Sequence, residues 1–220
     1  MLCYNRFMKI KKLGHCCFVM EPVIGLRIMT DPGEYSDLQN TETNIQVVLI
    51  THEHPDHLHI ESLKKVLENN PDCLIITNTA VGKLLDDAGI KYSIVEDGQD
   101  YEIAGVKIHG FGNVHEEVYE KFGQVQNTGY MINNLCYPGD SFANPNMPID
   151  ILALPVAGPW MRIKDAIKYA LELKPRAVFP VHDGMIVETR PGPIYRLPST
   201  ILPENNIEFK KLEIGIEEEI

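Results

Sequence analysis

Cysteine is scarce in this chain, and the cysteines present are scattered at Cys3, Cys16, Cys17, Cys73 and Cys136. They show neither the spacing of a disulfide framework nor that of a C-x-x-C metal clip. The sequence therefore predicts a protein of a reducing compartment rather than a disulfide-stabilised secreted protein.

Long hydrophobic runs are also missing. No apolar stretch approaches the ~20 residues that a bilayer-spanning helix requires. The opening segment MLCYNRFMKIKKLGH lacks a basic stretch followed by an apolar core and a small-residue cleavage site. We therefore expect a cytoplasmic protein with no membrane segment. Met8 is an alternative start, because the strand pattern begins only there.

Positive charge is in short supply. The chain has 20 Lys and Arg against 31 Asp and Glu, so its formal net charge is -11. No dense basic run opposes this charge, and the small cluster of Lys9, Lys11 and Lys12 is expected to be solvated strand surface. Because a phosphate backbone would be repelled, nucleic acid is disfavoured as a partner. A small-molecule substrate fits better, and a homo-oligomer remains open.

Apolar and charged residues are present in ordinary proportions. Hydrophobic residues make up 44% of the 220 residues and charged residues 23%, which is enough to build a sizeable core. A chain of this length suits one domain over residues 1–220.

Strand and helix patterns alternate along the chain. A hairpin is expected over 9–29, in which KIKKLGHCCFVM forms one strand, and the apolar run 45–50 predicts a strand buried on both faces. Further expected elements are helices around 61–68, 80–88 and 163–174, strands over 73–77, 92–96, 149–156 and 177–181, hairpins over 101–112 and 128–140, a long ordered loop over 191–203 and a closing strand over 207–216. This mixture predicts an α/β (α+β) fold, an αββα sandwich of two mixed sheets with helices on the outer faces.

Histidines crowd into the segment Thr51-His52-Glu53-His54-Pro55-Asp56-His57, which directly follows the buried strand 45–50. His52 and His54 are two residues apart, so in an extended turn their side chains point the same way, while Asp56 and His57 can face a second cation. Imidazole and carboxylate groups that converge in space bind transition metals tightly. His115, Asp140 and His182 each follow a strand-like segment, and strand ends converge in such folds.

These residues resemble those of a known family. THEHPDH matches the H-x-H-x-D-H signature of the metallo-β-lactamase superfamily, and FGNVH, YPGD and PVHDG follow in that superfamily's order. Within it, LGHCCF, THEHPDHL and LPVAGPWMRIKDAIKYALELKPRAVFPVHDG resemble the L-ascorbate-6-phosphate lactonase-like hydrolases. Leu58-His59-Ile60 replaces the glycines that many members carry after the histidine cluster, which argues against thioester hydrolases.

The resemblance implies a set of metal ligands. His52, His54 and His115 would hold one metal and Asp56, His57 and His182 the other, with Asp140 bridging them. The cofactors would be two divalent ions, with zinc expected ahead of manganese or iron. Two such ions can share a water and lower its pKa towards ~7, which generates hydroxide at neutral pH. Asp56 would assist as a catalytic acid or base.

Other residues have an expected role beside a plain structural one. Asp31 in MTDPG is either a turn residue or an acceptor that orients a ligand imidazole. His15 is either a group that supports the metal ligands from behind or a hydrogen-bonded packing histidine. Trp160 and Arg162 could line the pocket and bind substrate, or cap and pack a helix. Residues 116–127 could form a flap over the metals or an inert loop.

The leading hypothesis is a metal-dependent hydrolase that acts through a metal-activated hydroxide on a small anionic substrate, a lactone or phosphorylated sugar derivative. One alternative is a phosphodiesterase or ribonuclease, because the same metals support attack at phosphorus. Another is a metal-stabilised ligand-binding protein without turnover. An oxygen-using iron enzyme is a further possibility.

Overall fold

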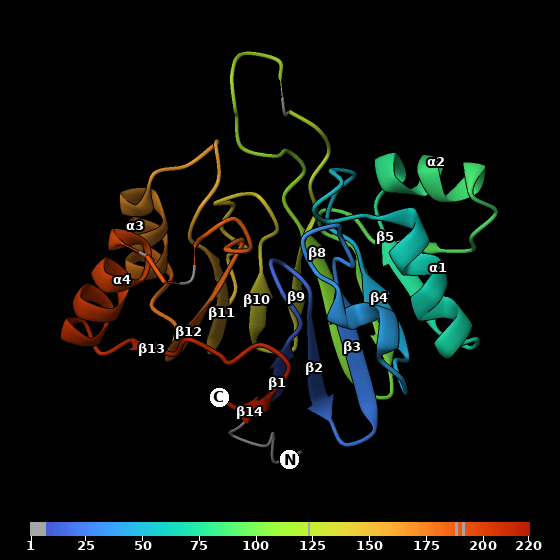
Figure 1. Cartoon of the computed structure of the whole chain (residues 1–220), viewed down its shortest axis with the longest axis horizontal. Helices are drawn as coiled ribbons and strands as arrows, with labels where there is room; N and C mark the ends of the chain where they lie inside the picture. Colours follow the sequence, from blue (N-terminus) through green and yellow to red (C-terminus); the bar gives the residue numbers. More distant parts are fainter. Residues whose placement is uncertain (1–7, 123, 188, 191) are drawn as a thin grey trace.

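The computed structural model describes residues 8–122, 124–187, 189, 190 and 192–220. In this part of the chain the strands form two seven-stranded sheets, with orders β14-β1-β2-β3-β4-β5-β6 and β13-β12-β11-β10-β9-β8-β7. Both sheets mix parallel and antiparallel pairs. The sheets face each other, with α1 and α2 outside one and α3 and α4 outside the other (Figure 1). The predicted αββα sandwich is confirmed.

The first sheet and its helices come mainly from the first half of the chain. Their bounds are β1 Lys9–Lys12, β2 Phe18–Val23, β3 Leu26–Thr30, the 3-10 helix η1 Leu38–Thr41, β4 Val47–Leu49, α1 Ile60–Asn69, β5 Leu74–Thr77, α2 Thr79–Asp87, β6 Ser93–Ile94 and, from the end of the chain, β14 Glu217–Glu219.

The second sheet follows. Its elements are β7 Asp100–Ile103, β8 Val106–Phe111, β9 Gly129–Ile132, β10 Leu135–Tyr137, β11 Ile151–Pro155, α3 Ile163–Leu173, β12 Ala177–Val181, α4 Pro193–Glu204 and β13 Glu208–Phe209.

Along each strand, successive side chains point to opposite faces of the sheet, which separates the core between the sheets from the layers beneath the helices. On β4, Val47 and Leu49 pack into the core between the two sheets, whereas Val48 faces the opposite way into the cluster beneath α1 and α2. This is the two-residue period of a strand with both faces covered. The apolar run that predicted a doubly buried strand is explained by this position.

The first predicted hairpin is wrong in one respect. The segment KIKKLGHCCFVM does not form one strand but two antiparallel strands, β1 and β2, in which Lys12 pairs with Phe18. Residues 13–17 form the loop between them, closed by a hydrogen bond from the Leu13 N–H to the Cys17 carbonyl (2.9 Å). Gly14 has a φ of +151° and pairs with Ser36, which breaks the strand. The break carries His15 to the site described below.

The predicted loop over 191–203 is also wrong, because α4 begins at Pro193. Proline fits the first turn of a helix, where its missing N–H would have no intrahelical acceptor. Ile194, Leu197 and Leu202 repeat at helical spacing and pack with α3 in one cluster. This packing outweighs the hydrogen bond that Pro198 removes inside the helix.

The expected closing strand over 207–216 is replaced by two short strands on different sheets. β13 extends the second sheet beside β12, and β14 returns to the first sheet beside β1. Leu212 and Ile220 pack into the core between the sheets, so the end of the chain links both. No helix in the described residues is long and apolar enough to cross a bilayer.

Candidate metal centre

Asp31 and the predicted metal ligands lie in loops that follow β3, β4, β8, β10 and β12. These loops meet at one edge of the sandwich, uppermost in Figure 1. The strand ends thus bring together side chains as distant in sequence as Asp31 and His182. All seven predicted metal ligands lie in this one cluster: His52, His54, Asp56, His57, His115, Asp140 and His182.

One group of possible ligands contains only histidines. A donor atom from each of His52, His54 and His115 lies within 4.8 Å of the other two. The Nε2 of His52 is 3.1 Å from the Nδ1 of His54. Burial lowers the pKa of both His52 and His54, so both rings are neutral at pH 7, the form that binds a cation.

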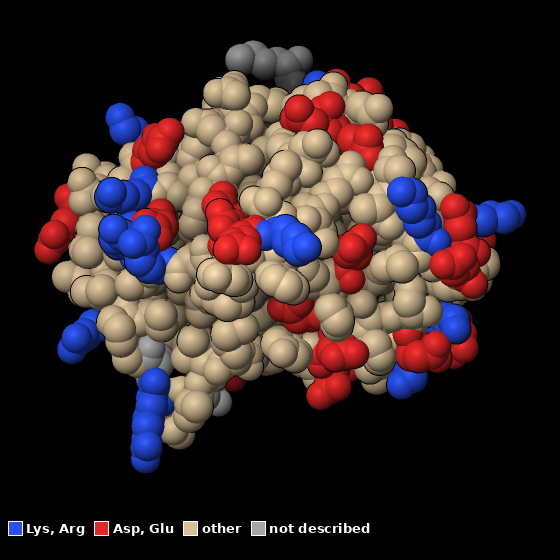
Figure 2. Space-filling view, turned by 90° about the horizontal axis from the view of Figure 1, so that it is seen from above, with Lys and Arg blue, Asp and Glu red and all other residues tan. Residues whose placement is uncertain are grey.

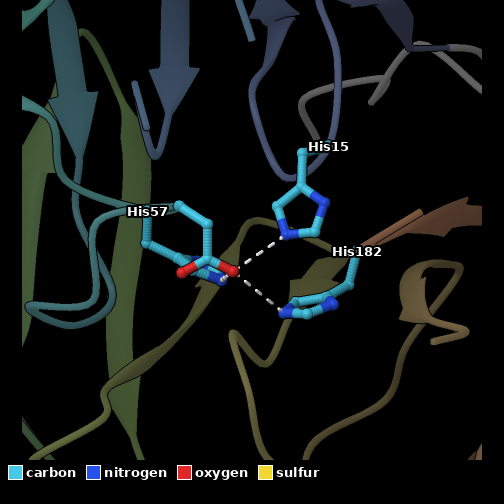
Figure 3. Close-up of side chains that lie close together, drawn as sticks. His15, His57 and His182 are labelled. Carbon is cyan, nitrogen blue, oxygen red and sulfur yellow. Dashed lines mark hydrogen bonds and ion pairs between the residues drawn. The ribbon is translucent and has the colours of Figure 1, made fainter. Parts of the chain in front are cut away.

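A second group surrounds the Asp56 carboxylate. The Nε2 atoms of His15, His182 and His57 lie 3.2, 3.5 and 3.9 Å from its Oδ2. Figure 3 shows the rings of these three histidines turned toward one another. Burial alone would raise the pKa of Asp56, but the hydrogen bond from His15 and the charge of His57 outweigh it and lower the pKa to about 2. Asp56 is therefore ionised at neutral pH.

Asp140 lies between the two groups. Its Oδ2 is 3.2 Å from His115 Nε2 and 2.9 Å from His182 Nε2, and its Oδ1 is 3.2 Å from His57 Nε2. Burial would raise the pKa of Asp140, but the facing histidines His57 and His182 lower it well below its ordinary value. A single carboxylate thus contacts both histidine groups.

Hydrogen bonds fix the orientation of three rings. The Nδ1 of His52 contacts Thr51 Oγ1 (3.0 Å), that of His57 contacts Asp31 Oδ2 (2.7 Å), and that of His115 contacts the Glu116 carbonyl (2.5 Å). With the ring proton on Nδ1, His52 and His115 present a bare Nε2 to the centre. Burial would lower the pKa of His57, but the charge of Asp140 raises it well above its ordinary value, so His57 would lose its second proton on binding a cation.

Asp31 anchors this arrangement from below. It is fully buried and has a φ of +32°. Its Oδ1 accepts from the Thr51 N–H (2.8 Å), and its Oδ2 accepts from Thr51 Oγ1 (2.7 Å), His57 Nδ1 and the Tyr137 hydroxyl. These contacts fix the orientation of the His57 imidazole, and the role of Asp31 as support for a metal ligand stays a prediction.

The unpaired atoms of the cluster fit a cation. Among the described residues, His57 Nε2, Asp140 Oδ1 and both ring nitrogens of His182 are buried without a hydrogen-bond partner. Orphaned buried polar atoms are rare in folded proteins. Four such atoms in one cluster suit a metal ion, and histidine with carboxylate is a donor set suited to zinc, manganese or iron.

A cavity of about 330 Å³ opens above the donors. His54, Asp56, His115, Asp140 and His182 line it, together with Glu34 and an apolar wall of Tyr35, Pro55, Val118, Pro159, Trp160 and Met185. We call these last six residues the apolar wall. The volume suits a small molecule.

The structure places one of the two predicted substrate-binding residues at the cavity and the other away from it. Trp160 belongs to the apolar wall, and its ring lies 5.8 Å from that of His115 and 5.6 Å from that of His182. Arg162 is not brought to the site. Its side chain is 75% exposed and contacts Asp165 (3.1 Å), because Arg162 caps the first turn of α3. The expectation that Arg162 lines the pocket is therefore wrong.

The predicted flap segment is rooted at the site. The His115 N–H donates to the Val125 carbonyl (3.0 Å), and the Glu116 N–H donates to the Asp140 carbonyl (2.9 Å). Val118 lines the cavity, while Tyr119 and Phe122 are exposed. The described part of 116–127 thus contributes to the cavity wall, and whether it opens and closes stays a prediction.

Cys16 and Lys12 are among the residues at the site that were not predicted from the sequence. A Cys16 Sγ, a His57 nitrogen and an Asp140 oxygen lie within 4.8 Å of one another, and burial raises the pKa of Cys16 to about 12. Lys12, expected at the surface, is buried and pairs with Asp183 (2.5 Å) next to His182. In the sequence, the only indication of a role for Cys16 or Lys12 was its position near Gly14-His15, because the residues around both have the pattern of an ordinary strand.

The comparisons with known proteins agree with this geometry. Residues 9–182 match the model of the Beta-lactamase superfamily domain. Protein Rv0786c of Mycobacterium tuberculosis is 28% identical over 195 residues, which cover 86% of this chain and 90% of the relative. A metal-dependent hydrolase of Thermococcus onnurineus is 29% identical over 201 residues, covering 79% and 84%. Igni18, a metallo hydrolase from Ignicoccus hospitalis, superposes with a TM-score of 0.77 at 18% identity, covering 97% and 98%.

The αββα sandwich and the histidine–aspartate cluster at its edge define a metallo-β-lactamase-fold protein with a metal-binding site. The chain belongs to the beta-lactamase superfamily. Within that superfamily it is a metal-dependent hydrolase.

Proposed function

We propose that this hydrolase holds two divalent metal ions, with zinc favoured over manganese or iron. The position of Asp140 carries this proposal, because its carboxylate lies between the all-histidine group and the group around Asp56. His52, His54 and His115 would hold one ion, and Asp56, His57 and His182 the other, with Asp140 shared. When bound, such a pair supplies Lewis acidity and activates water as a nucleophile near neutral pH.

The protein's own groups have defined tasks in this scheme. Asp31, through His57, and Thr51, through His52, hold the bare Nε2 atoms toward the centre. Asp56 and His54 are the partly exposed members of the donor set, with 20% of the Asp56 side chain accessible, and of the two only Asp56 is a carboxylate. It is therefore placed to accept or return a proton at the substrate, as a catalytic acid or base.

The sequence predicted a small anionic substrate, a lactone or a phosphorylated sugar derivative. Of these we propose a lactone, because no Lys or Arg lines the cavity in the described chain to bind an anionic group. The cavity volume supports a small substrate, and the resemblance of the segments LGHCCF and THEHPDHL to lactonase-like hydrolases is the reason for proposing this bond type. The phosphodiesterase and ribonuclease alternatives gain no support, since no Lys or Arg is among the residues that line the cavity in the described chain. The non-catalytic alternative lacks its usual sign, because both Asp56 and Asp140 are present.

We also propose a cellular location and a domain organisation for this protein. The four described cysteines, Cys16, Cys17, Cys73 and Cys136, are free, which supports a reducing, cytoplasmic location. Residues 1–220 are proposed to act as one domain, because the core between the sheets contains both Met8 and Ile220.

The test is a panel of lactones, phosphodiesters and thioesters assayed with protein of measured metal content. Asp56→Ala and His115→Ala should each reduce lactone hydrolysis by at least about a hundredfold. His109→Ala is the matched control, since His109 contacts Asp100 away from the site. Activity that survives both site variants, or a fully loaded protein with no metal at these residues, would reject the proposal.

A further inference from the structure

Resting on the proposed function, we propose a class for the part of the substrate beyond the bond that is cleaved. This part is apolar and either uncharged or positively charged, rather than a phosphate- or carboxylate-bearing group. The cavity outside the ligand set carries one acidic side chain and an apolar wall.

The wall provides contacts for an apolar group. Tyr35, Val118 and Met185 line the cavity and are each more than a third exposed, so they offer apolar surface to a bound molecule. Trp160 closes the inner side, where Phe142 packs against it with ring centroids 5.4 Å apart. Covering this surface with an apolar substrate group would be favourable, since the gain scales with the apolar area removed from water.

Positive charge is missing where an anionic tail would need it. Among the described residues, no Lys or Arg lines the cavity; Lys12 and Arg162 are paired with Asp183 and Asp165, and Lys121, three residues from Val118, is exposed outside the lining. Figure 2, which views the molecule from above the strand ends, shows most basic side chains around the margin of this face. Near the middle, one basic group lies against acidic groups.

Glu34 adds negative charge to the cavity. The loop that carries it is fixed by a hydrogen bond from the Glu34 N–H to the Pro55 carbonyl (2.8 Å), next to Asp56. Its side chain is exposed, and no hydrogen bond or ion pair with another described residue holds its carboxylate. An unpaired carboxylate beside the aromatic rings of Tyr35 and Trp160 would attract a cationic group and repel an anionic one.

The chain also supplies a reporter for binding. Trp160 is the single tryptophan of the sequence, and it lines the cavity. Quenching or a spectral shift of its fluorescence therefore reports occupation of the cavity, whether or not the ligand is hydrolysed.

The test uses lactones of one ring size that differ only at the end of a five-carbon tail: methyl, trimethylammonium, carboxylate or phosphate. Their cyclic ether analogues serve as non-hydrolysable binding probes. With metal-loaded protein, we expect the methyl and trimethylammonium compounds to exceed the carboxylate and phosphate compounds by at least about tenfold in kcat/KM and in affinity.

Glu34→Gln should reduce the ratio of kcat/KM for the trimethylammonium compound to kcat/KM for the carboxylate compound severalfold. Glu204→Gln, which changes an exposed acid at the end of α4, should leave this ratio unchanged.

The two proposals fail in different ways. If no lactone is hydrolysed but the fluorescence titration keeps the order of tails, the proposed reaction is wrong and the inferred substrate class stands. If the carboxylate or phosphate probe binds as tightly as the methyl probe, the inferred class is wrong even when hydrolysis occurs. Loss of the signal in Trp160→Phe shows that it arises from Trp160 and not from the added compound, because no tryptophan then remains.

Discussion

The Nε2 of His15 lies 3.2 Å from the Oδ2 of Asp56, and the Nδ1 of the same ring accepts a hydrogen bond from the Gly184 N–H (3.0 Å). Burial lowers the pKa of His15 to about 4, although Asp56 acts to raise it, so the ring is neutral at pH 7. Since Nδ1 is an acceptor, the ring proton lies on Nε2 and is donated to Asp56. We therefore expect His15 to position the carboxylate instead of offering a lone pair to a cation.

The first prediction concerns this contact. His15→Ala should weaken metal affinity and lower kcat each by about 10- to 100-fold, because Asp56 loses the donor that orients it. His15→Gln should restore part of both, since a glutamine amide can donate to the carboxylate. Competition with a chelating dye and steady-state kinetics measure the two effects. A His15→Ala protein with unchanged metal affinity and kcat would show that His15 is only a packing residue.

Asp31 gives the second prediction. Asp31→Asn removes the charge that four donor groups share and turns one acceptor atom into a donor facing the hydrogen of His57 or Tyr137. We expect a loss of roughly 3 kcal/mol in the free energy of unfolding. Urea unfolding of metal-free protein measures this loss without a contribution from the cation. Asp72→Asn, at an exposed turn, should stay within about 0.5 kcal/mol of the parent protein. A similarly small change for Asp31→Asn would refute the anchoring role.

Much of the fold and of the donor set could be predicted because both depend on local patterns. The run Ile45–Ile50 predicted a doubly covered strand, and the strands end where the motif residues begin. Hence His52, Asp140 and His182 meet once the sheets are formed. The proposed metal ligands follow from motif spacing and chain order.

What could not be predicted depends on contacts across the chain. The break at Gly14 is set by its pairing with Ser36, and α4 forms because its own Leu202 packs into the cluster shared with α3 despite Pro198. Arg162 has the chemistry to bind an anion, but the first turn of α3 directs its side chain to Asp165. None of these contacts leaves a periodic signal in the sequence.

The third prediction tests the close packing of the Asp31 turn against the metal-binding loop. A Cβ on Gly33 would lie 1.9 Å from the Asp56 carbonyl oxygen and 2.5 Å from the His57 nitrogen, and neither backbone atom can move without displacing a predicted ligand. Gly33→Ala should therefore cost about 3 kcal/mol or more and reduce metal binding. Gly89→Ala is the comparison, because Gly89 has a φ of +69° and open space around it, so it should cost only about 1 kcal/mol and leave metal binding intact. Equal costs at the two positions would mean that the approach of Gly33 to Asp56 is not tight.

Metal removal gives the last prediction. In the metal-free protein the carboxylates of Asp56 and Asp140 face imidazole nitrogens that are left without hydrogen bonds, so a cation that binds only the folded state should stabilise it. At a free zinc concentration about a thousandfold above Kd, the gain is about 4 kcal/mol for one site, and a second site adds to it. Thermal unfolding before and after dialysis against a chelator measures the shift, and metal analysis of the reloaded protein should give two ions per chain.

His115→Ala should lower that number to one while keeping part of the thermal shift, because the group around Asp56 is left intact. His59→Ala should still bind two, since His59 contacts Ser62 at the start of α1. A parent protein that binds a single ion, or a His115→Ala protein that still binds two, would contradict the division of the donors into two sites joined by Asp140.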